Sequence, residues 1–283
     1  MNNKSILITG ASTGIGKACA LHLDNMGFVV FAGVRKERDK DTLYKDASDK
    51  LKPIILDVTK EDTIVEAAEI ISNEAEYPLY GLVNNAGIGI SGVLEATPET
   101  EFRKLLEVNV IGLHAVTRAL LPLLRKNKGR IINIGSSASF MAGPGASSYA
   151  ASKFAVRAIS DSLRLELKPF GMFVSLVAPG AIESDIWDKA KVYKEKLRNN
   201  VAPELLEAYN LFIKAGDKMV DIIKPIPALE VVNAVTHGLT SNKPKYVYLV
   251  GNDAKKAYKL SKLPKSLFNW LVMKKITKVS EGS

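Results

Sequence analysis

Short apolar runs alternate with amphipathic stretches along almost the whole of this 283-residue chain. The apolar runs, such as Ile131-Ile132 and Val174–Val177, are largely continuous rather than alternating with polar residues. This pattern indicates strands covered on both faces, as in a parallel sheet flanked by helices. We expect strands at Lys4–Thr9, Phe28–Val34, Pro53–Asp57, Leu79–Asn84, Arg130–Ser136, Phe173–Ala178 and Lys245–Val250, and helices at Gly14–Met26, Glu61–Glu76, Pro98–Lys126, Ser147–Pro169 and Ala228–Thr240.

One stretch interrupts this rhythm. Residues 181–227 delay the last strand by a largely helical insertion, and an excursion of this size after a sheet strand often covers a substrate site. We therefore expect an α/β fold with a single-domain, Rossmann-type, doubly wound parallel sheet over residues 1–250. The insertion would form a helical substrate lid, and residues 251–283 would form a basic helical tail.

The positive charge of the chain is concentrated in that tail. The net charge is +9; eight lysines against Asp253 and Glu281 give residues 251–283 a charge of +6, which leaves +3 for the rest. A nearly neutral body argues against nucleic-acid binding. The tail could lie on an anionic membrane surface as a peripheral contact, pack on its own domain, or pack on a partner subunit. Its apolar residues, interrupted near Pro264, are Leu260, Leu263, Leu267, Trp270 and Leu271.

The termini and the cysteine content predict a cytoplasmic protein. The opening run Ile6–Ile8 is too short for the apolar region of a secretory signal. No uninterrupted apolar run approaches the ~20 residues that a membrane-spanning helix requires. The lone cysteine, Cys19, excludes an intrachain disulfide and fits a reducing compartment.

A glycine-rich turn follows the first expected strand. Residues Thr9–Gly16 read T-G-A-S-T-G-I-G and lead into a helix. Glycines permit a sharp turn and a close approach of the backbone to a ligand, and a helix N-terminus offers free N–H groups and a positive dipole. Strand, turn and helix together predict a pyrophosphate-binding loop for a dinucleotide cofactor.

This turn resembles the T-G-x-x-x-G-x-G motif of the short-chain dehydrogenase/reductase family. Asp57-Val58 resembles the family's adenine-contacting position, Asn84–Gly87 its N-N-A-G motif, and Pro179–Ser184 its P-G motif beside the nicotinamide, with Ser184 where many members carry threonine. These motifs keep the family's order from Ile6 to Ser184. The resulting cofactor-binding residues are Gly10, Ser12, Thr13, Gly14, Ile15, Gly16, Arg35, Asp57, Val58, Asn85, Ala86, Gly87, Tyr149, Lys153, Pro179, Gly180, Ile182 and Ser184.

The end of the second strand indicates which cofactor is preferred. NAD-specific members place an acid there for the ribose hydroxyls. This sequence has Val34 at that position and Arg35 after it. Arg35 can pair with a 2′-phosphate through a charge-assisted fork, and Ser12 can add a hydroxyl contact. We predict NADP(H) as the preferred cofactor, with NAD(H) as a second option.

The pair Tyr149 and Lys153 carries the predicted chemistry. Their i,i+4 spacing places both side chains on one helix face. Free tyrosine has a pKa of about 10, and a nearby ammonium is expected to lower that pKa and make the phenol a better acid/base near neutrality. The resemblance implies that Tyr149 donates the proton during carbonyl reduction and that Lys153 also binds the nicotinamide ribose.

Two further residues match the family's catalytic set. Ser136 lies thirteen residues before Tyr149 and would bind the substrate oxygen, with Ser137 as the neighbouring alternative. Asn109 matches the fourth member, which helps to hold a water that links Lys153 to solvent. No metal is required, and a serine hydrolase is excluded because G-x-S-x-G and a partnered histidine are absent from the sequence.

The expected function is hydride transfer between NADP(H) and a carbonyl or alcohol. Apolar residues in the insertion favour a lipophilic substrate, steroid-, retinoid- or lipid-like, although the same residues could pack the insertion onto the body. They are Trp187, Val192, Tyr193, Leu197, Leu205, Leu206, Tyr209, Phe212 and Met219. The alternatives are a catalytically silent NADP(H)-sensing regulator and a membrane-associated interaction protein. The resemblance also implies a homodimer or homotetramer, with Pro98–Lys126 and Ser147–Pro169 at the interface.

Overall fold

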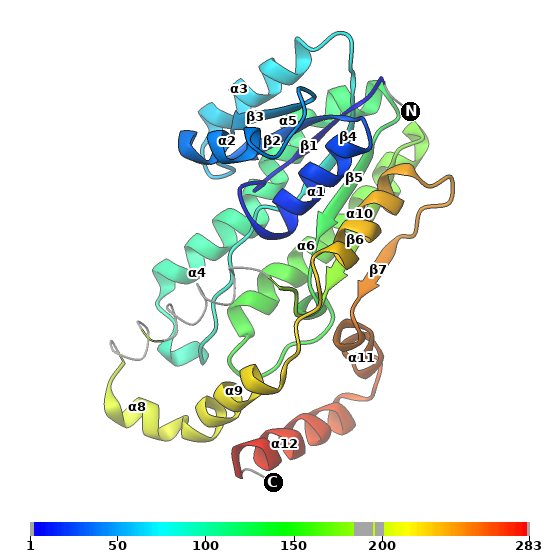
Figure 1. Cartoon of the computed structure of the whole chain (residues 1–283). Helices are drawn as coiled ribbons and strands as arrows, with labels where there is room; N and C mark the ends of the chain where they lie inside the picture. Colours follow the sequence, from blue (N-terminus) through cyan, green and yellow to red (C-terminus); the bar gives the residue numbers. More distant parts are fainter. Residues whose placement is uncertain (1–2, 184–194, 196–200, 282–283) are drawn as a thin grey trace.

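The computed structural model describes residues 3–183, 195 and 201–281 of the chain. Its strands form one seven-stranded, entirely parallel sheet in the order β3-β2-β1-β4-β5-β6-β7 (Figure 1). This is the predicted doubly wound α/β fold, in which the strand order reverses beside β1. The strands are β1 (Ser5–Ile8), β2 (Val29–Val34), β3 (Leu51–Ile55), β4 (Leu79–Asn84), β5 (Arg130–Ile134), β6 (Phe173–Pro179) and β7 (Val247–Val250).

Helices cover both faces of the sheet, and each face has its own apolar core. One core joins α1 and α10 to the sheet, and the other joins α3 and α5 to it. Every residue of β1 and β2 is buried, as their continuous apolar runs predicted. The helices are α1 (Gly14–Asn25), α2 (Glu37–Tyr44), α3 (Glu61–Ser72), α4 (Glu99–Leu106), α5 (Leu113–Lys126), α6 (Ser147–Leu167), α8 (Pro203–Ala208), α9 (Asn210–Ile222), α10 (Leu229–Thr240), α11 (Asn252–Leu260) and α12 (Lys265–Glu281), with short turns η1 (Leu94–Ala96), η2 (Glu107–Gly112), η3 (Ser137–Ser139) and η4 (Lys168–Phe170).

The long helix expected at Pro98–Lys126 is not uniform. A π-helical segment, η2, separates α4 from α5 and contains Asn109. At its end, Gly112 permits a close approach to the turn after β3: a Cβ there would lie 2.7 Å from Val58 Cγ2. By length and composition alone, Glu99–Lys126 would be able to cross a membrane. In the structure its α5 part packs against β4 and α3, as a core helix does.

The first edge of the sheet differs most from the sequence prediction. The third strand begins two residues earlier than expected and includes Pro53, which pairs with Ala32 of β2. Proline is tolerated because β3 is an edge strand, where its missing N–H costs no ladder hydrogen bond. The helix α2 was not predicted, since only Leu43 among its residues is buried.

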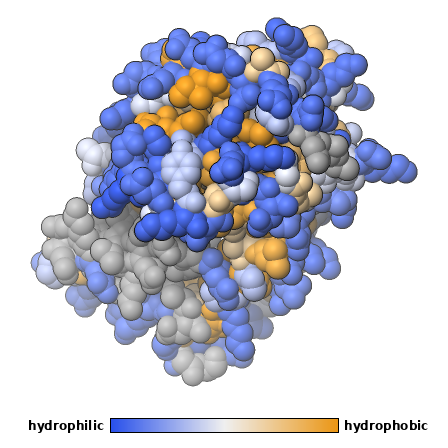
Figure 2. All heavy atoms as spheres, turned by 45° about the horizontal axis from the view of Figure 1, so that its top comes forward, coloured by the Kyte–Doolittle hydropathy of each residue, from blue (hydrophilic) through white to orange (hydrophobic). Residues whose placement is uncertain are grey.

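The insertion and the tail meet beyond the carboxyl ends of the strands. Helix α12 lies along α9 (Figure 1), and Lys218 Nζ donates a 3.0 Å hydrogen bond to the Ser280 carbonyl oxygen. The tail therefore packs on its own domain through α12, and the contacts with a membrane or a partner subunit stay predictions. Large apolar side chains on α12 nevertheless stay exposed, including Trp270. The face of the molecule shown in Figure 2 is mostly hydrophilic, with separate hydrophobic groups.

Candidate active site

The glycine turn after β1 packs closely against the segment after β4. Gly10 has a φ of +66°, and a Cβ on it would lie 2.9 Å from Ala86 Cα. A Cβ on Gly16 would lie 2.2 Å from the Gly10 carbonyl oxygen and 2.5 Å from Asn85 Nδ2. These positions therefore require glycine for steric reasons, as the predicted phosphate loop does.

Thr9 connects the two segments and was not identified as a site residue from the sequence. Its hydroxyl accepts hydrogen bonds of 3.0 Å from the backbone N–H groups of Asn85 and Ala86. Asn85 Nδ2 in turn donates to the carbonyl oxygens of Thr9 and Gly10, both at 3.0 Å. The threonine at the start of T-G-x-x-x-G-x-G was the available signal, because it precedes the turn at the end of a buried strand.

The start of α1 has the features of an anion site. Helix α1 begins at Gly14, and its N-cap residue, Thr13, makes no side-chain capping hydrogen bond. No acidic side chain lies in the first turn of α1. The first-turn N–H groups, the positive end of the dipole and the cradle made by Gly10 and Gly16 fit the pyrophosphate of a dinucleotide. Ser12 and Ile15 lie half-buried on the same turn.

The adenosine side of the predicted pocket lies at the ends of β2 and β3. Val34 is buried and Arg35 is exposed, and Arg35 forms no ion pair among the described residues. Asp57 Oδ1 accepts hydrogen bonds from the Thr59 N–H at 3.1 Å and the Thr59 hydroxyl at 2.8 Å. Asp57 therefore shapes the turn into α3, and its contact with the adenine stays a prediction. Val58 is buried below that turn.

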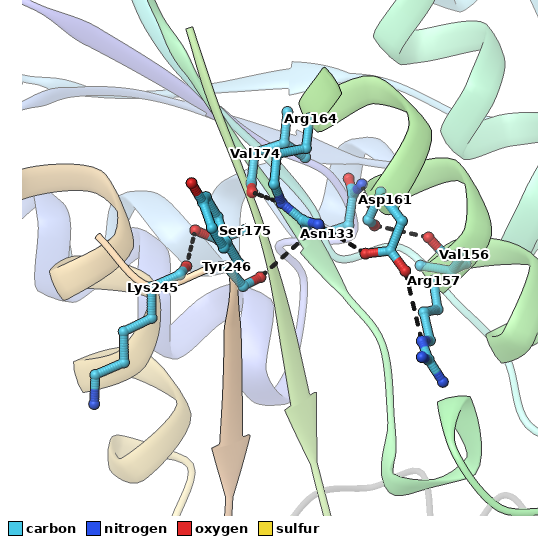
Figure 3. Close-up of polar contacts among 10 residues, drawn as sticks. Asn133, Val156, Arg157, Asp161, Arg164, Val174, Ser175, Lys245 and Tyr246 are labelled. Carbon is cyan, nitrogen blue, oxygen red and sulfur yellow. Dashed lines mark hydrogen bonds and ion pairs between the residues drawn. The ribbon is translucent and has the colours of Figure 1, made fainter. Parts of the chain in front are cut away.

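The helix that carries Tyr149 and Lys153 is tied to the sheet at its far end. Figure 3 shows Arg164 of α6 between β6 and the segment before β7, with Nε donating to the Val174 carbonyl oxygen at 3.2 Å. Its guanidinium also lies over the Tyr246 ring and pairs with Asp161 at 2.8 Å. Asn133 of β5, labelled in the same view, donates through Nδ2 to Ser160 Oγ of α6 at 2.9 Å. These contacts fix the position of α6 relative to β5 and β6.

Ser136, Tyr149 and Lys153 come together at the carboxyl end of β5. The Ser136 and Tyr149 side chains are joined by a hydrogen bond. Ser136 Oγ also accepts the Ala138 N–H at 3.1 Å. Lys153 Nζ donates to the Ile134 carbonyl oxygen at 3.0 Å and lies 5.8 Å from the centroid of the Tyr149 ring. This geometry favours Ser136 over Ser137 for the predicted role.

Burial controls the titration of this pair. It lowers the pKa of the Lys153 ammonium to about 8. It also raises the pKa of the Tyr149 phenol above its ordinary value, while the hydrogen bond with Ser136 opposes that rise. Among the groups of the chain itself, desolvation of the phenolate is therefore the largest influence on the pKa of Tyr149. The lowering expected from Lys153 together with the bound nicotinamide stays a prediction.

Asn109 links three elements through its side chain. Its Oδ1 accepts the Ile88 N–H at 2.8 Å, and its Nδ2 donates to the Ile88 carbonyl oxygen at 2.9 Å and to Ser152 Oγ at 3.1 Å. Both amide hydrogens are therefore used within the protein. A Cβ on Gly87 would lie 3.3 Å from Asn109 Oδ1 and 3.7 Å from Lys153 Nζ, so the Asn109 amide and the Lys153 ammonium both lie close to Gly87. Ser152 was not identified from the sequence.

The segment after β6 lies on the same edge of the sheet. Pro179 ends β6 beside Val250, and the Gly180 N–H donates to the Val250 carbonyl oxygen at 2.9 Å. Ile182 is buried and forms a bridge with Ile226, where the insertion returns to the body. Ser184 falls outside the described residues, as do four of the nine apolar residues named for the lid: Trp187, Val192, Tyr193 and Leu197.

The described part of the insertion contacts the loop after β4. Tyr209 Oη donates to Glu95 Oε2 at 2.9 Å, and this carboxylate raises the pKa of Tyr209. A cavity of about 250 Å³ lies between η1 and the start of α8, lined by residues that include Glu95, Thr97 and Leu205. Half-buried Leu205, Leu206, Tyr209, Phe212 and Met219 lie on α8 and α9, or between them.

Comparison with known proteins identifies the family. Residues 4–194 match the model of the short chain dehydrogenase family. The chain belongs to the short-chain dehydrogenase/reductase family. It is 39% identical to a 3-amino-tetrahydro-pyrrolizinone reductase of Xenorhabdus hominickii, over 93% of this chain and 92% of that protein. It is 35% identical to retinol dehydrogenase 7 of Mus musculus, over 91% and 84%.

A solved structure agrees with these relatives. A short chain dehydrogenase from Burkholderia cenocepacia in complex with NADP has a TM-score of 0.73 and 26% identity, and the match covers 96% of this chain and 99% of that one. The protein is thus an NAD(P)-dependent oxidoreductase that acts on CH–OH groups, as its relatives indicate. This identification favours an enzyme over the silent regulator and the interaction protein considered from the sequence.

Proposed function

We propose that this dehydrogenase/reductase prefers NADP(H) and interconverts a lipophilic alcohol and its carbonyl compound. The observation that carries the proposal is the meeting of Ser136, Tyr149 and Lys153 at one strand end, beside a glycine turn suited to a pyrophosphate. This arrangement provides a proton donor and an oxygen-binding hydroxyl next to a cofactor site.

The chain's own groups perform the proton chemistry. The chemistry that the nicotinamide supplies when bound is hydride transfer to or from the substrate carbon. Tyr149 stays protonated near neutral pH because its pKa is raised, so its phenol can donate a proton to the substrate oxygen in the reductive direction. Ser136 binds the same oxygen and stabilises the developing charge. Lys153 places a cation beside Tyr149, and Asn109 positions α6 and the Ile88 loop.

The preference for NADP(H) rests on the end of β2. Buried Val34 occupies the position where an acid would repel a 2′-phosphate. Arg35 is exposed and free of ion pairs among the described residues, so its guanidinium is available to a phosphate from solvent. The structural relative with bound NADP supports the same choice.

The proposal of a lipophilic substrate rests on the composition of the insertion, whose helices α8 and α9 are expected to cover the site. The side chains of Leu205, Leu206, Phe212 and Met219 are apolar and half-buried. A relative named as a retinol dehydrogenase is consistent with an apolar substrate. Part of α9 packs on α12, which by itself explains apolar side chains on α9. The half-buried apolar residues of α8 therefore support a lipophilic substrate more strongly than those of α9.

An assay of cofactor oxidation tests the proposal. Purified enzyme is supplied with NADPH or NADH and a panel of steroid, retinoid, quinone and short-chain carbonyl compounds. The proposal predicts turnover with NADPH and a lipophilic carbonyl. Turnover with short-chain carbonyls alone would refute the substrate class, and faster turnover with NADH would refute the cofactor preference.

The variant Arg35→Ala tests the cofactor preference at one residue. We expect the KM for NADPH to rise about tenfold, because a charge-assisted contact of roughly 1.4 kcal/mol is lost, while the KM for NADH stays the same. Arg38→Ala is the matched control, since Arg38 is exposed nearby and is close to Asp39 at 3.8 Å. An unchanged KM for NADPH in Arg35→Ala would contradict this assignment.

We propose a cytoplasmic homodimer or homotetramer with its interface on η2 and α6. Exposed apolar side chains on these elements support this: Ile111 is 52% exposed, Phe154 40% and Leu165 73%. Light scattering after gel filtration measures the mass in solution. A monomer at micromolar concentration would exclude the proposed assembly.

A further inference from the structure

A carboxylate of the basic tail lies against the segment that follows β6. Asp253, in the first turn of α11, accepts the Ala181 N–H through Oδ2 at 2.7 Å and the Ala254 N–H through Oδ1 at 2.9 Å. Ala181 directly follows the Pro179-Gly180 motif, and 72 residues separate it from Asp253. The contact therefore joins the tail to the edge of the sheet where the cofactor motifs gather.

Two glycines make room for this carboxylate. A Cβ on Gly180 would lie 1.9 Å from Asp253 Oδ1 and 2.0 Å from Oδ2. A Cβ on Gly251 would lie 2.6 Å from Oδ1, and Gly251 has a φ of +93°. Asp253 is an exposed residue, but its carboxylate oxygens lie against two glycine backbones, where any larger residue would displace them. The contact with Ala181 therefore depends on both glycines.

The two ends of the insertion meet at the same place. Ile226, on the returning segment, donates its N–H to the Ala181 carbonyl oxygen and accepts the N–H of Glu183, both at 3.0 Å. The Cδ1 of Ile226 would also contact a Cβ on Gly251 at 3.3 Å. Residues 180–183 are thus held by the tail on one side and by the returning end of the insertion on the other.

We propose that Asp253 is a positioning residue for the cofactor site, and that it fixes the Gly180-Ala181 segment and the root of the insertion through the Ala181 N–H. The inference deepens the proposed function and rests on it for the role of Pro179-Gly180. It assigns the tail a part in the enzyme's own site. Asp253 touches neither substrate nor cofactor in this account; it acts through the backbone of the segment.

The test measures cofactor affinity by calorimetry, independently of turnover. Wild type is titrated with NADPH and NADH, and the variants with whichever binds more tightly. We expect Asp253→Ala to raise the dissociation constant about tenfold, which corresponds to roughly 1.4 kcal/mol. In assays, the KM for the cofactor should rise more than kcat falls. An unchanged dissociation constant would overturn the inference and would leave the proposed reaction intact.

A matched pair separates positioning from simple stabilisation of α11. An acid in the first turn also stabilises a helix through its dipole. The double variant Asn252→Asp with Asp253→Ala restores that acid one residue away but not the contact with Ala181. We expect its thermal stability to return toward wild type while its cofactor affinity stays low. Recovery of the affinity would show a merely structural role and would contradict the inference.

Gly180→Ala supplies an independent check on the geometry. In the wild-type background its new Cβ would collide with the Asp253 carboxylate, so cofactor affinity should fall. In the Asp253→Ala background the three atoms nearest to that Cβ are removed, so Gly180→Ala should lower the cofactor affinity less than it does in wild type. Equal losses in both backgrounds would show that the carboxylate does not occupy this position.

Discussion

The floor of the site and its cover are built in different ways. The floor, formed by the carboxyl ends of β1, β4 and β5 with α6, is held by buried and part-buried hydrogen bonds between short motifs, such as those of Asn109 and Thr9. The cover, formed by α8 and α9 of the insertion with α11 and α12 of the tail, is held by the packing of α12 on α9 and by a few exposed polar contacts, such as Tyr209 with Glu95. A tightly bonded floor can fix catalytic groups, whereas a loosely held cover can adapt to a substrate.

The largest expected effect comes from removing the proton donor of the floor. Tyr149→Phe keeps the ring and deletes the hydroxyl that hydrogen-bonds Ser136. We expect kcat for carbonyl reduction to fall about 10³-fold, the usual range for loss of a general acid. Cofactor affinity should change little, and calorimetry checks this in parallel. A variant that retains a tenth of the activity would show that another group donates the proton.

A pair of glycine substitutions compares floor and cover directly. Gly16→Ala puts a Cβ 2.2 Å from the Gly10 carbonyl oxygen, so we expect weaker cofactor binding and a loss of about 2 kcal/mol in unfolding free energy. Gly216→Ala lies within α9, where no described atom is within 4 Å of the new Cβ, and should raise stability by roughly 0.5–1 kcal/mol. Chemical denaturation measures both. Equal changes of the same sign in the unfolding free energies of the two variants would show that floor and cover do not differ in this way.

The pH dependence of stability tests the burial of Lys153. Its pKa is about 8 in the folded chain against 10.5 for the free group, so the unfolded chain binds more protons between these values and stability rises with pH. Lys153→Met removes this dependence. Relative to that variant, the unfolding free energy of the wild type should therefore rise by on the order of 2 kcal/mol between pH 7 and pH 10. The control Lys256→Met, at an exposed lysine of α11, retains Lys153 and should keep the pH dependence of the wild type.

The smallest effect is expected at the contact between the cover and the body. Tyr209→Phe deletes one exposed hydrogen bond to Glu95, and such bonds contribute about 1 kcal/mol or less. The KM for the substrate should rise by about threefold or less, with kcat unchanged. Tyr44→Phe, at an exposed tyrosine remote from the insertion, is the control. A change above tenfold would mean that the cover is held much more firmly than its contacts indicate.

The sequence predicted the floor because its elements are local. Continuous apolar runs identified all seven strands, and glycines at fixed spacing identified the turn before α1. The exceptions have physical causes: α2 buries only Leu43 and so lacks an apolar stripe, and the raised pKa of Tyr149 depends on three-dimensional burial. Roles assigned to single residues of the site remain predictions.

The cover was predicted only as a helical insertion and a tail. Which of their faces meet depends on contacts between residues far apart in sequence, such as Lys218 with Ser280. The contact between Asp253 and Ala181 has the same long-range character, and its only local signs are Gly180 and Gly251. A single sequence shows such glycines but not the carboxylate that they accommodate.

We expect hydride to pass directly between a nicotinamide cofactor and a carbonyl carbon held by Ser136 and Tyr149. The most direct measurement uses NADPH dideuterated at C4 with a carbonyl compound that the wild-type enzyme reduces, followed by mass spectrometry and NMR of the alcohol. We predict one deuterium on the carbinol carbon of the product, and none above background for Tyr149→Phe. An alcohol product without deuterium on that carbon would contradict the account.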